Sequence, residues 1–405
     1  MRILFGIFLG IVLTINLSAQ ETGCIEGDCE NGYGVYKTSL YTYYGDFLDG
    51  KKHFWGCQDY ESNKQVYCGN YSQGNKHLIG TYYFYDGDND FFMGIYDRNK
   101  QKRTGFYIDA SAADNGAISM RRDALKIKPK YTPAKDGIGC VDGDCENGNG
   151  VYVYKNGEIY SGGFFEGEWN GWGCYQFFHE DEGVVNRIYC GLYKEGRSYG
   201  TGFNFISDED SYSFDGGSIE NTLDFEIGLS NGTGDIKTGI HTADISDAEE
   251  RNSLQYKFGE GNIGNAKPSG ATSRSDKVCL LGNCKNSNSG FSITSSYNNG
   301  DFFGYEYTGN QINMRLNGYG CQYFPKHPKL IEQDDSASSE FLYCGNFIDG
   351  SPMYYGTTYF GGSSVVDTRF YFGLHDGFSW VKHGVYAYKN GNDGWVIETA
   401  NYNEE

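Results

Sequence analysis

Twelve cysteines divide the sequence into three groups of four, and the spacing inside the groups repeats. In each group the first two cysteines are five positions apart, the third ends a Trp-Gly-Cys or Tyr-Gly-Cys, and the fourth opens a Cys-Gly. A glycine follows each fourth cysteine six positions later, and each unit closes on two glycines 11 positions apart. Independent spacings that stay constant in three places indicate an internal repeat.

The same spacing predicts how the thiols pair. The step from the third to the fourth cysteine is 11, 16 and 23 positions, which fits two antiparallel strands joined by a loop that tolerates insertion. The first two cysteines of each group would close a small loop at the start of the unit. Joining first to third and second to fourth is an open alternative, because sequence alone does not fix connectivity. The predicted pairs are Cys24–Cys29, Cys57–Cys68, Cys140–Cys145, Cys174–Cys190, Cys279–Cys284 and Cys321–Cys344.

A strand-and-turn pattern fills the repeated units. Between 144 and 178, apolar residues alternate with turn residues, and Asn-Gly, a strong hairpin signal, occurs three times. Versions of this stretch recur at 28–60 and 283–324. The chain has 59 Gly but 6 Pro, and 17% of its residues are aromatic, so helix signals are few. The sequence therefore predicts an all-β fold.

The glycine and aromatic spacing resembles that of MORN repeats (membrane occupation and recognition nexus), whose pattern is roughly Y-x-G-x-[WFY]-x-x-G-x-x-x-G-x-G. The third unit fits only after an insertion, and the cysteines depart from the family pattern. The resemblance implies stacked β-hairpins that bind proteins or membrane lipids. The residues that fit position by position are Tyr160, Gly162, Phe164, Gly167, Gly171 and Gly173, and again Tyr189, Gly191, Tyr193, Gly196, Gly200 and Gly202.

Hairpins of this length cannot bury one face alone, so stacking them would bury their aromatic rings against one another. We expect an elongated solenoid of stacked β-hairpins in three homologous, disulfide-stapled modules, with three separately packed β-domains as the alternative. The expected division is a signal peptide at 1–19, module 1 at 20–109, a linker at 110–138, module 2 at 139–242, a linker at 243–277, and module 3 with a tail at 278–405.

The N-terminal segment and the charge indicate where the protein works. Arg2, an apolar run and Leu17-Ser18-Ala19 have the form of a secretory signal peptide, which predicts a periplasmic, cell-surface or extracellular protein. An even cysteine count in an exported protein indicates a disulfide framework. The net charge of −20 disfavours nucleic acid and anionic membranes as partners.

The common sequence motifs for nucleotide binding and for metal binding do not occur in the chain. It contains neither the phosphate-binding pattern G-x-x-x-x-G-K-[ST] nor the metalloprotease pattern H-E-x-x-H. The cysteine spacing, with no histidines in register, does not favour zinc, and the acidic run 86–90 lacks the glycine and glutamate of a calcium-binding EF-hand loop. We therefore expect no enzyme activity and no cofactor. A hydrolase with a carboxylate pair is kept as an alternative, because acidic residues are abundant.

Aromatic residues are the candidate ligand-binding groups. Trp55, Trp172 and Tyr319 occupy the same place in each unit, just before Gly-Cys, and Trp169 lies in a turn. Rings repeated along one face of a sheet can stack on sugars, whereas the alternative is that they pack on the next hairpin. We expect an exported, non-enzymatic repeat protein that binds or scaffolds envelope or extracellular partners, with carbohydrate binding through this aromatic row as the alternative.

Overall fold

The computed structural model confirms an all-β protein made of antiparallel sheets with almost no helix. Within the described residues, the strands form two nine-stranded sheets, one seven-stranded sheet and one two-stranded sheet. The described residues are 22–84, 90–109, 117–122, 129–179, 184–208, 222–230, 234, 236–242, 254–258, 277–278, 294–295, 306–312, 315–324, 340–361, 369–377, 383–389 and 395–401.

Each large sheet is a meander in which every strand pairs with the next one along the chain. Sheet 1 contains β1 (Gly23–Gly27), β2 (Tyr33–Lys37), β3 (Thr42–Leu48), β4 (Lys51–Tyr60), β5 (Gln65–Ser72), β6 (Asn75–Phe84), β7 (Phe91–Asp97), β8 (Lys100–Asp109) and β9 (Ala117–Arg122). Sheet 2 contains β10 (Gly139–Gly143), β11 (Asn149–Val153), β12 (Ile159–Phe165), β13 (Glu168–His179), β14 (Val184–Lys194), β15 (Arg197–Asp208), β16 (Thr222–Ser230), β17 (Ile236–Thr242) and β18 (Leu254–Phe258). Sheet 3 contains β21 (Glu306–Ile312), β22 (Arg315–Phe324), β23 (Glu340–Ile348), β24 (Ser351–Gly361), β25 (Arg369–Asp376), β26 (His383–Lys389) and β27 (Trp395–Asn401), and β19 (Lys277–Val278) pairs with β20 (Thr294–Ser295).

Two of the segments expected as linkers contain regular structure. Strand β9 and helix α1 (Pro133–Asp136) fall within 110–138, and β18 falls within 243–277. β9 and β18 are the last strands of sheets 1 and 2, respectively. Among the described residues, no helix is both long enough and apolar enough to span a bilayer.

A row of glycines crosses each large sheet at right angles to the strands. In sheet 1, Gly45 pairs with Gly56, Gly56 with Gly69, and Gly69 with Gly80. Tyrosine rings lie on these glycines, so a Cβ on Gly56 would stand 2.3 Å from the Tyr43 hydroxyl. The glycines are therefore required because the rings lie against the bare backbone. Sheets 2 and 3 repeat the arrangement, with Tyr160 over Gly173, Tyr189 over Gly202 and Tyr343 over Gly345.

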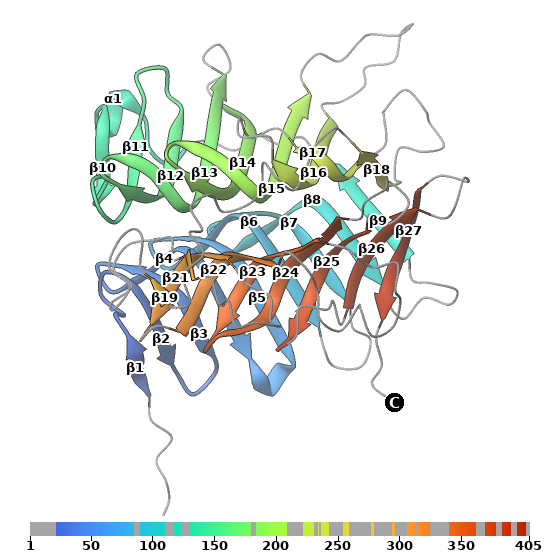
Figure 1. Cartoon of the computed structure of the whole chain (residues 1–405). Coiled ribbons are helices and arrows are strands. Elements are labelled where there is room, and N and C mark those ends of the chain that lie inside the picture. Colours follow the sequence, from blue (N-terminus) through green and yellow to red (C-terminus); the bar gives the residue numbers. More distant parts are fainter. Residues whose placement is uncertain are drawn as a thin grey trace, which may run out of the picture.

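The three large sheets share one hydrophobic core, so the alternative of three separately packed β-domains is wrong. Strands β4, β13 and β22 approach one another at the centre, and Figure 1 shows sheet 2 (green) lying over sheets 1 (blue) and 3 (orange to red). Trp55, Trp172 and Tyr319 meet there, with ring centroids 4.2–5.0 Å apart. Such tilted and edge-on ring pairs add to the stabilisation from burial alone.

Polar bonds between sheets also fix their relative positions. The Tyr354 hydroxyl of sheet 3 donates to Asp59 Oδ2 of sheet 1 at 2.6 Å, and the hydroxyls of Thr201 and Thr357 join sheets 2 and 3 at 2.6 Å. All four of these residues are buried. Because an unsatisfied buried polar group is costly, these pairs specify one register between the sheets.

Five of the six predicted disulfides are confirmed. Cys57–Cys68, Cys174–Cys190 and Cys321–Cys344 join neighbouring strands, and their half-cystines are fully buried in the shared core. Cys24–Cys29 and Cys140–Cys145 close the small loops at the start of sheets 1 and 2. The predicted pair Cys279–Cys284 lies outside the described residues.

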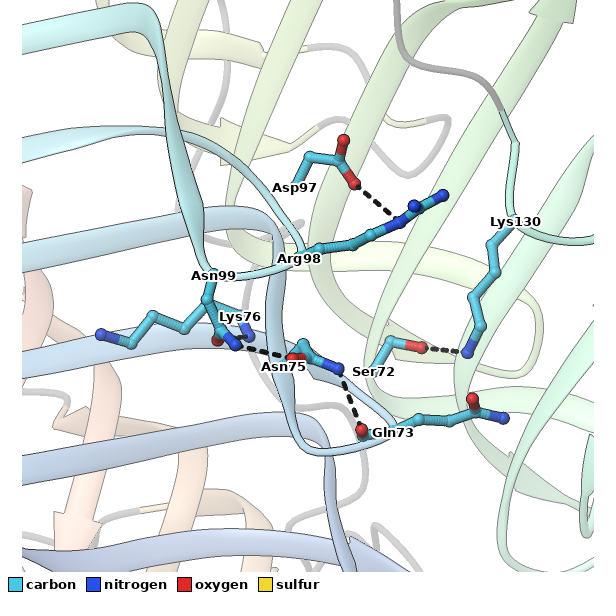
Figure 2. A network of polar contacts seen from close by, with 8 residues as sticks. All are labelled: Ser72, Gln73, Asn75, Lys76, Asp97, Arg98, Asn99 and Lys130. Carbon is cyan, nitrogen blue, oxygen red and sulfur yellow. Dashed lines mark hydrogen bonds and ion pairs between the residues drawn. The ribbon is translucent and has the colours of Figure 1, made fainter.

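Hairpin turns line up along one edge of sheet 1 and bond to one another. The Asn99 side chain accepts from the Lys76 amide at 2.8 Å and donates to Asn75 Oδ1 at 2.6 Å (Figure 2). Lys130, from the segment between sheets 1 and 2, donates to Ser72 Oγ at 2.6 Å. At the turn between β5 and β6, Gln73 and Gly74 both have positive φ, 49° and 83°, as a two-residue hairpin turn requires.

Candidate functional site

The predicted aromatic row does not reach solvent. Trp55, Trp172 and Tyr319 are 2%, 6% and 2% exposed, respectively, because they pack on one another where the three sheets meet. Buried rings cannot stack on a sugar, so carbohydrate binding through this row is wrong. The alternative that these rings pack within the fold is the one that the structure supports.

Trp169, the fourth candidate, lies elsewhere and is only half-buried. It stands at the start of β13, just after the turn at Glu166 and Gly167, and pairs with Phe164 across the hairpin. Its ring lies parallel to that of Tyr160, with centroids 4.6 Å apart and 7° between the planes. Its Nε1 donates to the Tyr154 hydroxyl at 3.1 Å, so the indole is held in one orientation.

Trp169 forms one wall of an aromatic groove of about 240 Å³ on sheet 2. The groove crosses β13, β14 and β15, on the side of the sheet that carries the Tyr160 and Tyr189 cluster rather than the shared core. Five of the lining residues carry aromatic rings, and Ser198 adds a hydroxyl. The described lining residues are Trp169, Tyr175, Phe177, Tyr189, Tyr193, Gly196, Ser198 and Gly234.

Hydrogen bonds hold the rim of the groove in place. The Ser198 and Ser230 hydroxyls lie 2.6 Å apart, and the Gly234 amide donates to Ser198 Oγ at 2.8 Å. Arg187 donates to the Gly234 carbonyl at 3.1 Å, and its guanidinium lies 4.7 Å from the centre of the Phe177 ring. A cation at this distance from a ring face is a favourable contact. The groove is therefore largely formed before any ligand binds.

The electrostatics of the groove suit binding more than proton transfer. Burial raises the pKa of the Tyr193 and Tyr160 phenols well above their ordinary value. Burial, followed by its hydrogen bond to Glu158, also raises the pKa of Tyr175. These phenols stay protonated at neutral pH and act as donors, as Tyr175 does to Glu158 Oε2 at 2.7 Å. Among the described lining residues, none is a carboxylate, histidine, lysine or cysteine.

The groove contains few groups that could catalyse a reaction or hold a metal. A glycosidase needs two carboxyl groups that face one substrate, and the described lining residues supply none. In the described part of the chain, no three His, Cys, Asp or Glu side chains gather as a metal site would require. The arrangement can stack on a ring and exchange hydrogen bonds with it.

Comparisons with known proteins find no match for this chain, either among protein-family models or among curated proteins. The resemblance to MORN repeats therefore stays a prediction.

Sequence reasoning found Trp169 but missed the rest of the groove. Tyr175 and Phe177 are two positions apart on β13, so the sequence placed them on one face of a strand. Many other aromatic residues of this chain have the same spacing, so it did not single these two out. Ser198 and Gly234 carried no signal, because they are distant in sequence and meet only through the packing of β15 against the segment after β16. The one available signal was the position of Trp169 in a predicted turn.

Proposed function

We propose that the protein is an exported, non-enzymatic binding protein and that the aromatic groove of sheet 2 is its ligand-binding site. The observation that carries the proposal is the half-buried Trp169, stacked on Tyr160 and fixed by Tyr154 at the wall of a groove of about 240 Å³. Binding sites are usually preformed, concave and lined by aromatic and apolar groups with a few polar ones. The groove meets each of these criteria.

The fold supports this role by holding the groove rigid. We propose that the three large sheets are homologous MORN-like modules, each a stack of hairpins on a glycine row. This is supported by the cross-strand disulfide and the glycine pair that occur next to each other in all three, such as Cys57 beside Gly56 and Cys174 beside Gly173. A scaffold of this kind can present a binding surface without moving parts.

Export is supported by the disulfides. Five pairs within the described residues indicate an oxidising environment, such as the periplasm or the outside of the cell. The N-terminal signal peptide, which lies outside the described residues, is proposed on its sequence alone.

Carbohydrate is the ligand class that the groove favours. Sugar rings stack their C–H faces on flat aromatic rings, and their hydroxyls need donors and acceptors at the edge of the stack. Trp169 and Tyr175 offer the ring faces, and the Ser198 hydroxyl lies in the same groove. We propose this ligand class in place of the buried aromatic row.

A glycan array with matched variants tests the proposal. The purified mature protein should bind at least one neutral glycan, and Trp169→Ala should weaken that binding at least tenfold, while Tyr386→Ala should not. Tyr386 is a suitable control because it is also half-buried and stacked, on Tyr371 and Tyr388 of sheet 3. Equal loss in both variants, with both folded, would overturn the assignment of the groove.

A further inference from the structure

Sheet 1 carries a second unusual surface, on the side that corresponds to the groove of sheet 2. We call it the lysine–tyrosine face, defined by Lys52, Lys76, Gln58 and the tyrosines around them. Lys52 lies four residues before Gly56, where sheet 2 has Trp169 four residues before Gly173. Lys76 lies four residues before Gly80, where sheet 2 has Ser198 before Gly202. At equivalent positions, therefore, sheet 1 has two cations where sheet 2 has an indole and a hydroxyl.

Each ammonium group is held over three tyrosine rings. Lys52 Nζ lies 4.8, 5.5 and 5.2 Å from the ring centres of Tyr41, Tyr43 and Tyr71, respectively. Lys76 Nζ lies 4.4, 4.4 and 5.5 Å from those of Tyr67, Tyr82 and Tyr60. Contacts of this kind offset part of the cost of removing a cation from water.

A chain of hydrogen bonds joins the two lysines. Lys52 Nζ donates to Gln58 Oε1 at 2.8 Å, and Gln58 Nε2 donates to the Tyr60 hydroxyl at 2.7 Å. The Tyr60 and Tyr82 hydroxyls bond to each other, and Lys76 Nζ donates to the Tyr82 hydroxyl at 3.2 Å. The two cations thus belong to one polar network, not to two separate contacts.

Among the described residues, no carboxylate forms an ion pair with Lys52 or Lys76. Lys76 is only 9% exposed, and buried ammonium groups in proteins are normally paired. The chain has 53 acidic residues against 33 basic ones, so a buried and a half-buried lysine without a carboxylate partner among the described residues are unexpected. Burial lowers the pKa of both amines to about 8, and the charge of Lys52 contributes to the lowering for Lys76.

The lysines are also held in place by the fold. The Lys76 amide and carbonyl both bond to Asn99 in the next turn, at 2.8 and 3.1 Å. Figure 2 shows the Lys76 side chain pointing away from Lys130 and Ser72, so the Lys76 cation is separate from the one at the boundary with sheet 2. The geometry is therefore that of a preorganised anion site, with donors fixed before the anion arrives.

We propose that the lysine–tyrosine face binds an acidic saccharide, with a ring carboxylate accepting hydrogen bonds from Lys52 and Lys76. An oxyanion would supply the missing counter-charge, and each ammonium has further N–H groups to donate beyond the one bond it makes here. Tyr41, Tyr60 and Tyr82 are half-buried, and their exposed parts give a sugar ring surfaces to lie on. These rings distinguish a saccharide from a bare phosphate or a lipid headgroup.

Binding of uronic-acid oligosaccharides to the full mature chain tests this proposal. The probes are oligogalacturonates, with neutral galactose oligomers of equal length as the comparison, measured by calorimetry at pH 7. We expect binding of the acidic oligomers only, weakened about tenfold by Lys52→Gln and as much again by Lys76→Gln, since a charge-assisted hydrogen bond contributes about that factor. Lys52→Arg, which keeps the charge, should retain most of the affinity.

Lys51→Gln is the matched control, because Lys51 is exposed, carries the same charge and precedes Lys52 on β4. It should bind as well as the parent protein. Lys76→Gln truncates a buried side chain. If that variant does not fold, Lys52→Gln, at a half-buried position, still tests the proposal. Trp169→Ala should leave this binding unchanged, which separates this site from the groove of sheet 2.

Three results would overturn the proposal. One is no binding of oligogalacturonate by the folded parent protein. Another is equal loss in Lys51→Gln and Lys52→Gln, which would indicate a diffuse charge effect. The third is binding only to vesicles of phosphatidylglycerol and phosphatidylcholine, which would assign the face to an anionic membrane.

Discussion

Sheets 1 and 2 share one backbone plan but present different chemistry on corresponding faces. Both have a glycine row covered by tyrosines, a buried cross-strand disulfide and turns along one edge. Sheet 1 places Lys52 and Lys76 above its tyrosines, whereas sheet 2 places Trp169 and Ser198 at those positions and leaves a groove. Sheet 3 has Leu316 and Pro352 there. Two side chains per sheet, on a common frame, are enough to change the chemistry of the face.

The comparison depends on the glycine rows, and breaking a row should have the largest effect. In Gly80→Ala the new Cβ would lie 2.2 Å from the Tyr67 hydroxyl, and Tyr67 is packed against Tyr71, Tyr82 and Tyr96. We expect a loss of about 3 kcal/mol or more in the free energy of unfolding, from overpacking. Gly74→Ala, in the neighbouring turn, meets no atom and should lose only about 1 kcal/mol through its positive φ. Urea denaturation under oxidising conditions measures both, and similar losses would contradict the structural role of the row.

The next largest effect is expected from the disulfides, because a core disulfide and a surface disulfide should contribute differently to stability. Replacing Cys174 and Cys190 by alanine opens a loop of 16 residues inside the core and should reduce stability by about 3 kcal/mol. Replacing Cys140 and Cys145 opens a loop of 5 residues at the surface and should reduce it by about 2 kcal/mol. Thermal unfolding of the two double variants measures the order. A larger loss for the surface pair would show that the core disulfide adds little to the frame.

Asp46, at the boundary between the two sheets, should give a pH-dependent effect. Burial raises the pKa of its carboxyl to about 7, although hydrogen bonds from the Trp55 backbone and the Asn149 side chain act in the opposite direction. The folded state therefore holds a proton that the unfolded state releases near pH 4, so the contribution of Asp46 to stability is lost as the pH rises from about 4 to 7.

Asp46→Asn should accordingly stabilise the protein more at pH 8 than at pH 5, by about 2 kcal/mol. Chemical denaturation of both proteins at both pH values measures this difference. Burial lowers the pKa values of His53 and His77 to about 4, so their contribution to stability changes with pH in the opposite direction. This contribution cancels when the stability of the variant is compared with that of the parent at the same pH. A difference that does not change with pH would mean that Asp46 is ionised in the folded protein.

Exchanging the two faces should have the smallest effect on stability and the sharpest effect on ligands. Trp169→Lys gives sheet 2 the residue that sheet 1 has at the equivalent position, and Lys52→Trp makes the reverse change. Both sites are half-buried, so we expect stability losses of about 1 kcal/mol. Trp169→Lys should abolish binding in the groove, and Lys52→Trp should abolish binding of acidic oligosaccharides, each without affecting the other site. Loss of both activities in either variant would contradict independent faces.

Much of the fold followed from the sequence because its signals are local. Asn-Gly turns, strand alternation and the spacing of Cys174 and Cys190 each depend on residues within one hairpin, so the all-β class and five disulfides were predictable. The equivalence of Trp55, Trp172 and Tyr319 was also visible. Their exposure was predicted only as one of two alternatives, and the structure selects burial.

The amino-acid sequence was sufficient to predict the hairpins and the recurring glycines, and its cysteine spacing favoured the five disulfide pairs that the structure has. Only the tertiary structure decided which face of each sheet is buried, because aromatic rings occupy both faces of the strands and alternation cannot distinguish them. Tyr43 lies on the glycine row of sheet 1, whereas Trp55 on the next strand enters the shared core. The meeting of three sheets settles that choice, since it covers one face of each. The other faces are left to carry the groove of sheet 2 and, on sheet 1, Lys52 and Lys76.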